Sequence, residues 1–168
     1  MPSTYEPIAT VTFNGSTSGA SFTAIPQTYT DIVAVCFVRS TEATAQTGIY
    51  TAVNTFTGTT SHTWLSGDGS AALSGRGSNA QYAWLGQINA ANATSGTFST
   101  VIAHYMNYSN TTTNKTVLSR PGSAAYNTQF YVNLIQTTSA LSRIDIVANN
   151  LNNFAAGSTI TLYGIKAA

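Results

Sequence analysis

Residues 150–166 read NLNNFAAGSTITLYGIK, and this stretch indicates the fold class most clearly. An Asn-rich turn and a glycine precede a run of β-branched and aromatic residues, which is the composition of a β-strand. Because side chains alternate across a strand, one face carries Ile160, Leu162 and Gly164, and the other carries Thr161, Tyr163 and Ile165. The second face is half apolar and uncharged, so we expect this strand to lie inside a sheet whose outer surface contacts another surface. The alternative is that Tyr163 is an ordinary surface aromatic residue.

The chain has 168 residues and a mass of 17.6 kDa, which fits a single domain over residues 1–168. A chain of this length buries about two thirds of the surface that it exposes when unfolded, so it folds without disulfides or metals. Charged residues make up only 7% of the sequence and the net charge is +1. This balance gives no electrostatic reason to expect nucleic acid, a membrane or an acidic substrate as a partner.

The cysteine content and the N-terminal segment give simple predictions. Cys36 is the one cysteine, so no intrachain disulfide is expected, and its apolar surroundings in residues 32–38 (IVAVCFV) predict a buried thiol. The segment Met1–Tyr5 has neither a basic region nor an apolar run. We therefore expect a protein that is made soluble in the cytoplasm without a signal peptide.

Short stretches rich in Val, Ile, Thr and aromatic residues recur along the chain between turn signals, with no long helical period. Residues 31–38 form an unbroken apolar run, which predicts a central strand covered on both faces. Residues 40–58 give a weak pattern. In all, the sequence predicts about nine to eleven strands, and we expect an all-β fold, a two-sheet antiparallel β-sandwich of jelly-roll type.

Three local patterns make more detailed predictions. The glycine-rich residues 75–79 are expected to continue the loop that begins at residues 66–70. The strand over residues 81–88 is expected to place Tyr82, Trp84, Gly86 and Ile88 on one face. Pro121 and Gly122 are expected to end the strand over residues 115–120.

The sequence offers little material for catalysis. General acid and base chemistry needs paired titratable groups, and the chain has five carboxylates and two histidines. His62 and His104 have no neighbours at a metal-ligand spacing, so structural roles are expected for both. Asp68 lies in a Gly-Asp-Gly turn that lacks the other ligands of a calcium loop. We expect no enzyme activity, no metal and no cofactor.

Trp64 and Trp84, together with several tyrosines, have two interpretations. Aromatic side chains on sandwich strands usually belong to the core. The other interpretation is a platform on which a sugar ring stacks. The sequence alone leaves both open.

Three segments resemble a group of small virion proteins and tail-associated domains of tailed bacteriophages, cyanophages among them. They are residues 21–33 (SFTAIPQTYTDIV), residues 106–120 (MNYSNTTTNKTVLSR) and the stretch 150–166. The segments 66–70 and 74–79 fit the same pattern, whereas residues 53–64 (VNTFTGTTSHTW) depart from it, which leaves the binding specificity of these loops open. The resemblance implies a β-sandwich that adds to the particle surface as a homotrimer, with no catalytic residues.

Two functions follow as expectations. The first is a virion structural protein, a capsid decoration or cement protein on the particle surface whose partner is the major capsid protein of the phage shell. Its candidate contact residues are Tyr163, Ile165, Trp64, Asp68 and Arg76. The alternative is a lectin-like module of the tail or baseplate that binds a host glycan, although such modules usually follow a trimerising stalk and none is visible here. A bacterial sugar-binding protein is a third interpretation.

Overall fold

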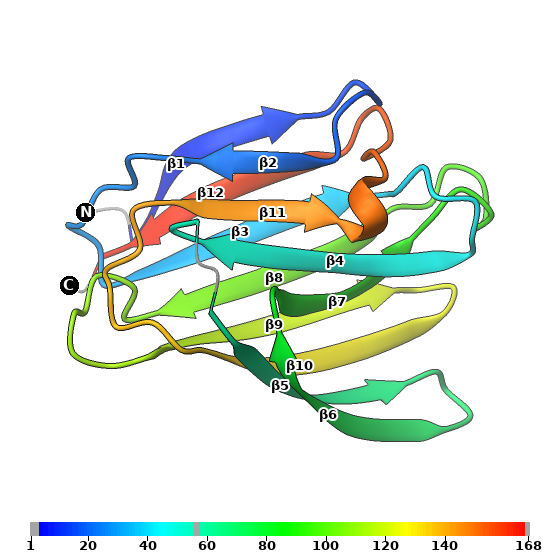
Figure 1. Cartoon of the computed structure of the whole chain (residues 1–168). Coiled ribbons are helices and arrows are strands. Elements are labelled where there is room, and N and C mark those ends of the chain that lie inside the picture. The colour runs from blue at the N-terminus through cyan, green and yellow to red at the C-terminus, as the bar shows by residue number, and fades with distance from the viewer. Residues whose placement is uncertain (1–3, 56–57, 167–168) are drawn as a thin grey trace.

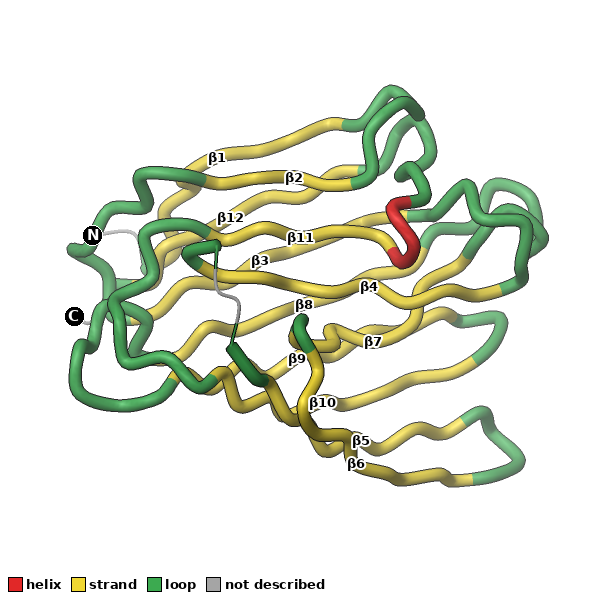
Figure 2. Tube along the Cα trace, in the orientation of Figure 1, coloured by secondary structure: helices red, strands yellow, loops and turns green. Residues whose placement is uncertain are grey.

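A computed structural model describes residues 4–55 and 58–166, which form an all-β sandwich of two antiparallel sheets (Figures 1 and 2). The larger sheet has the order β1-β12-β3-β8-β9-β10-β5-β6 and the smaller sheet the order β2-β11-β4-β7. The strands of these described residues are β1 (Tyr5–Thr12), β2 (Gly19–Phe22), β3 (Asp31–Val38), β4 (Gln46–Val53), β5 (Thr60–Gly67), β6 (Ala72–Ala80), β7 (Ala83–Asn89), β8 (Ser99–Met106), β9 (Lys115–Ser123), β10 (Asn127–Ile135), β11 (Ile144–Ala148) and β12 (Thr159–Ile165). A short 3-10 helix, Asn149–Leu151, follows β11. Most of the N-terminal segment used for the targeting prediction, and residues 56–57 of the segment that departs from the phage pattern, lie outside the described residues.

The strand order confirms the predicted jelly roll. Four strands of the larger sheet, β1-β12-β3-β8, face the four strands β2-β11-β4-β7 of the smaller sheet, which is the eight-strand pairing of two nested Greek keys. The pairs β5–β6 and β9–β10 are insertions, and both join the larger sheet. The larger sheet therefore extends beyond the smaller one, and β5 and β6 lie at its lower edge in Figure 1. The insertions bring the described strands to twelve, above the nine to eleven that the sequence predicts.

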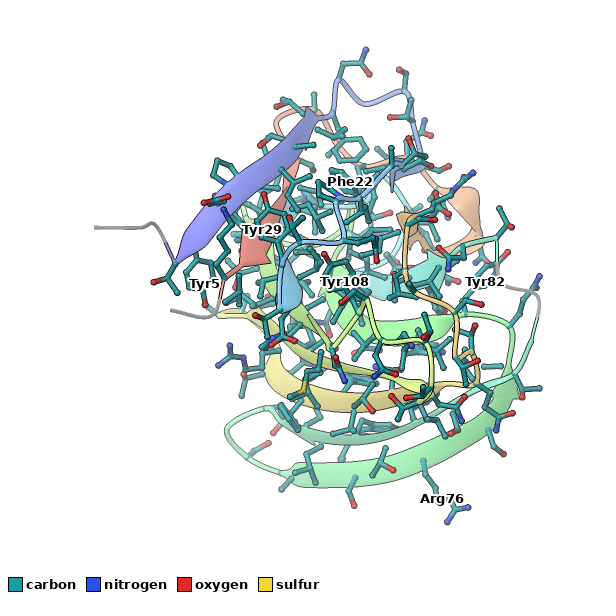
Figure 3. The ribbon with its side chains drawn as sticks, turned by 90° about the vertical axis from the view of Figure 1, so that its left-hand side faces the viewer. Tyr5, Phe22, Tyr29, Arg76, Tyr82 and Tyr108 are labelled. Atoms are coloured by element: carbon teal, nitrogen blue, oxygen red, sulfur yellow. The ribbon has the colours of Figure 1, made fainter. Side chains whose placement is uncertain are left out.

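The core lies between the sheets and follows the expected alternation. Ile160 and Leu162 of β12 are fully buried, as are Ile144 and Ile146 of β11. β12 pairs with β1 on one side and β3 on the other, so the prediction that it lies inside a sheet is correct. Phe22 and Tyr108 also lie between the sheets (Figure 3). Cys36 is buried, and this burial raises the pKa of its thiol to about 12.

Two of the three local predictions concern where strands and loops begin and end, and both are wrong. Residues 75–79 belong to β6, which pairs with β5 through a turn whose Asp68 carboxylate accepts hydrogen bonds from the backbone amides of Ser70 and Ala71. The glycines in this segment predict a loop, but in the structure Gly75 and Gly77 lie in a strand and let the rings of Trp64 and His62 pack closely over it. Similarly, β9 continues through Pro121, which pairs with Val101 of β8. Proline has no backbone N–H to donate to a neighbouring strand, but its presence does not end β9.

A β-bulge in β7 changes the faces of that strand. The pairing with β4 shifts between Ile49 and Tyr50, and Gly86 has a φ of +124°. As a result Leu85 and Ile88, which strict alternation places on opposite faces, are both fully buried in the core. The predicted common face of Tyr82, Trp84, Gly86 and Ile88 is therefore wrong.

Two cations hold the loops around the sandwich. The Arg39 guanidinium donates hydrogen bonds to the carbonyl oxygens of Ala91, Ala93, Thr94 and Thr97. The Lys115 ammonium is buried and donates to the carbonyl oxygens of Asn110, Thr113 and Thr138. These hydrogen bonds satisfy backbone carbonyl groups in loops, where no neighbouring strand provides a donor. In the part of the chain that the structure describes, no helix has the length and hydropathy needed to cross a bilayer.

Candidate functional site: an uncovered sheet face and an aromatic groove

The larger sheet has an outer face, which we define as the side turned away from the smaller sheet. β3 places Val35 and Phe37 on this face, where they are 40% and 47% exposed. Phe37 stacks on Phe98, with ring centroids 4.8 Å apart and planes at 14°. The apolar run of β3 predicts a strand covered on both faces, but on the outer face the described chain buries Val33 and leaves Val35 and Phe37 exposed. Apolar side chains of the kind usually found in a core are therefore exposed to solvent on this face.

A row of side chains, apolar except for His104, crosses the outer face from strand to strand. In register, Tyr163 of β12 lies beside Val33 of β3, which lies beside His104 of β8. His104 in turn lies beside Leu118 of β9, and Leu118 beside Val132 of β10. Residues that are directly opposite each other in a sheet have Cβ atoms about 5 Å apart, so these side chains are neighbours on the face. The row thus spans five strands.

β10 is inverted relative to an ordinary sandwich strand. Its outward residues are Phe130, Val132 and Leu134, which are 37%, 39% and 37% exposed. Its inward residues include Gln129 and Asn133, both buried, on either side of Tyr131. A sandwich strand normally turns its apolar side inward and its polar side to water. Tyr131 and Ile135 of β10 point inward, but the outward side is the more apolar of the two, and Leu65 of β5, in register with Phe130, extends it.

The outer face carries few charges. Asp31 accepts a hydrogen bond from the backbone amide of Asn107 at 2.6 Å, and its other oxygen lies 2.9 Å from His104 Nε2. This pair is satisfied within the chain. Arg120 and Arg76 are exposed at the side of β10 and at the far edge, where Arg76 points away from the molecule (Figure 3).

The second feature is an aromatic groove on the inner side of the same sheet. It forms where β5 and β6 extend beyond β7, the edge strand of the smaller sheet. Its volume is about 320 Å³, and it is lined by His62, Trp64, Ser66, Leu73, Trp84, Gln87, Asn127, Gln129 and Tyr131. Both tryptophans of the chain lie in it.

Three rings of the groove form a nearly parallel row. The Tyr131 ring lies between the two indoles, with its centroid 6.3 Å from Trp64 at 25° and 6.5 Å from Trp84 at 9°. Tyr50 packs edge-on against Trp84 at 4.6 Å, and His62 lies about 6 Å from both Trp84 and Tyr131. Offset parallel and edge-to-face pairs are the arrangements that the ring quadrupole favours.

Glycines of β6 make room for these rings. A Cβ on Gly75 would lie 2.9 Å from the Trp64 indole, and one on Gly77 would lie 2.6 Å from the His62 ring. Any larger residue at these positions would displace the rings. The glycine-rich sequence of β6 therefore shapes the floor of the groove.

Amide side chains form the polar wall of the groove. The Gln129 side-chain carbonyl oxygen accepts from the backbone amide of Gln87 at 3.0 Å, and its side-chain nitrogen donates to Gln87 Oε1 at 3.1 Å. Asn127 donates to the same oxygen at 3.4 Å and exchanges hydrogen bonds with Gln46. These bonds fix the orientation of the amides before any ligand arrives.

Burial keeps the groove uncharged. Desolvation, and secondarily the neighbouring Tyr50, raises the pKa of Tyr131 to about 12. Desolvation lowers the pKa of His62 below its usual 6.5, so the neutral imidazole dominates at neutral pH. The buried Nδ1 of His62 has no hydrogen-bond partner among the described residues.

The structure separates the five candidate residues predicted from the sequence. Tyr163, Ile165 and Arg76 lie on the outer face, whereas Trp64 lies in the groove and Asp68 in the turn between β5 and β6. Trp64 and Trp84 do come together, but the groove residues Tyr131, Gln87 and Gln129 were not predicted. The alternation of residues 129–134 could have indicated the polar wall, because Gln129 and Asn133 fall on the same face of the strand as Tyr131.

A larger hollow of about 790 Å³ lies over the smaller sheet. Its lining includes Arg143 and Asp145, which form an ion pair. Arg143 Nε and Asp145 Oδ2 are 2.8 Å apart, and this carboxylate raises the pKa of Arg143. The charges are thus paired with each other. Among residues 4–55 and 58–166, no group of three or more His, Cys, Asp or Glu side chains is placed to hold a metal ion.

No protein-family model matches the sequence, and no curated protein is significantly similar to it.

Proposed function

We propose that this chain is a non-enzymatic structural protein of a virion, a capsid decoration protein that attaches to its particle through the outer face of the larger sheet. The observation that carries the proposal is the inversion of β10, which turns Phe130, Val132 and Leu134 outward. Contiguous exposed apolar surface of this kind is costly in a free protein and is typical of interaction sites. The resemblance to small phage virion proteins supports the choice of partner, the major capsid protein.

The physical mechanism is mass action. A protein that binds the assembled shell but not its separated subunits stabilises the shell, and many symmetric copies multiply a weak contact. Low charge suits such a contact, because few ions lose their water when the outer face is covered. The Asp31 carboxylate is already hydrogen-bonded within the chain, to the backbone amide of Asn107 and to His104 Nε2. A homotrimer is part of the proposal, since it would triple the contacts that each attached unit makes.

Val35→Lys tests the proposal. Val35 is exposed on the outer face, so the change places a charge there with little effect on the core. Binding of the purified protein to shells that lack it should weaken at least about tenfold, because the buried charge has no partner. Thr23→Lys, at an exposed position after β2 of the smaller sheet, adds the same charge as a control.

Circular dichroism and thermal unfolding of each variant establish that it is folded. Wild-type binding by folded Val35→Lys would contradict the role of the outer face. If the wild-type protein does not bind shells at all, the decoration function itself is wrong.

A further inference from the structure

We propose that the aromatic groove is a binding site for a neutral carbohydrate. The inference goes beyond the attachment function, because the groove lies on the opposite side of the sheet from the outer face and uses different residues. Its nine lining residues are aromatic, amide, hydroxyl or aliphatic, with one neutral histidine. None carries a charge at neutral pH.

The aromatic row suits the apolar face of a sugar ring. Trp64 is partly exposed at the open side of the groove, and its indole rests on Gly75. Tyr131, which is buried, and Trp84 lie behind it in nearly parallel planes and support it. The axial C–H groups of a pyranose carry partial positive charge and pack against the negative face of such rings. A volume of about 320 Å³ lies at the lower end of the range of about 300–1,000 Å³ for small-molecule sites.

The polar wall suits hydroxyl groups. A sugar hydroxyl both donates and accepts hydrogen bonds, and a primary amide also does both. Within the described residues, Gln87 Nε2, Trp64 Nε1 and Tyr131 Oη make no hydrogen bond, so these donors remain available beside the rings. A proline-rich peptide is the other common ligand of aromatic grooves, and the test below distinguishes it from a sugar.

The groove is also rigid before binding. Gln129 holds Gln87 through two hydrogen bonds, and the rings of Trp64 and His62 pack closely over glycines of β6. Pre-organised polar groups lose little entropy when a ligand binds. This separates the groove from a loose surface cluster of aromatic residues.

Intrinsic fluorescence tests the inference directly, because both tryptophans of the chain lie in the groove. The full chain is titrated with cellobiose, lactose and N,N′-diacetylchitobiose, and a glycan array extends the panel of neutral sugars. We expect a saturable change in fluorescence with at least one neutral sugar. Trp64→Ala should weaken its binding about tenfold, measured by calorimetry.

Phe130→Ala is the matched control, because it removes an exposed aromatic ring from the outer face of the adjacent strand. It should leave sugar binding unchanged. Three results would overturn the inference: no neutral sugar binds, folded Trp64→Ala binds with wild-type affinity, or only an acidic sugar such as sialyllactose or a polyproline peptide binds. Shell binding is measured on the same variants, so failure here is distinct from failure of the attachment function.

Discussion

At the scale of single residues, His62 shows how burial sets the charge of the groove. Its ring lies over Gly77 and beside Trp84 and Tyr131, with no acidic group among the residues that line the groove. Desolvation therefore lowers its pKa in the folded protein. The unfolded chain keeps an ordinary histidine, with a pKa of about 6.5.

This difference predicts a pH dependence of stability. Below the unfolded pKa the unfolded chain binds a proton that the folded chain resists, so the free energy of unfolding falls as the pH drops from about 6.5 toward the lower folded value. Above that range the contribution of His62 is fully present. Urea unfolding between about pH 7.5 and pH 5.5 should show a steeper loss of stability for the wild type than for His62→Gln. Equal slopes would show that His62 is not the group responsible.

At the scale of elements, the bulge of β7 positions the groove. Gly86 has a φ of +124°, and a Cβ there would overlap the Pro121 ring and lie 2.9 Å from the Gln129 side-chain oxygen. Gly86→Ala should lower the free energy of unfolding by about 3 kcal/mol, because backbone strain and overpacking add.

Gly96→Ala is the control for this prediction. Gly96 also has a positive φ, +74°, but nothing lies within 4 Å of the position that a Cβ would take there. Gly96→Ala should lower the free energy of unfolding by about 1 kcal/mol, the cost of the backbone conformation alone. Chemical denaturation measures both values. Equal losses would show that space around Gly86 does not matter.

Elements that follow a simple alternation were predictable from the sequence. β12 and β11 show the expected buried faces, because each contributes one side to the core. β6 was missed because glycine is unfavourable in strands. The glycines of β6 make room for the rings of Trp64 and His62, which belong to β5 and are not adjacent in the sequence. The bulge of β7 was missed because an extra residue breaks the period of two without a sequence signature.

The candidate site was predictable only in part for the same reason. Trp64 and Trp84 stand out in the sequence as the two tryptophans. Their approach to one another depends on the overhang of β5 and β6 beyond β7, which is a property of the whole sandwich. Asp68 and Arg76 stand out as isolated charges, but the first completes a turn and the second lies on the opposite face from Trp64.

At the scale of the whole molecule, one sheet presents two surfaces of different chemistry. Its outer face is apolar across several strands, and its overhanging inner edge is aromatic and rich in amides. The inserted pairs β5–β6 and β9–β10 produce the overhang and extend the outer face, since they widen the larger sheet beyond the reach of the smaller one. An eight-stranded jelly roll without them would have no overhang. The insertions therefore connect the fold to both proposed interactions.

The most direct test of attachment through the outer face is cryo-electron microscopy of purified particles at a resolution that traces this chain. We predict density at many symmetry-related positions on the shell, with Val35, Phe130 and Val132 of the outer face covered by a neighbouring protein. Density confined to the tail, or an outer face turned to solvent at every position, would contradict the proposed attachment.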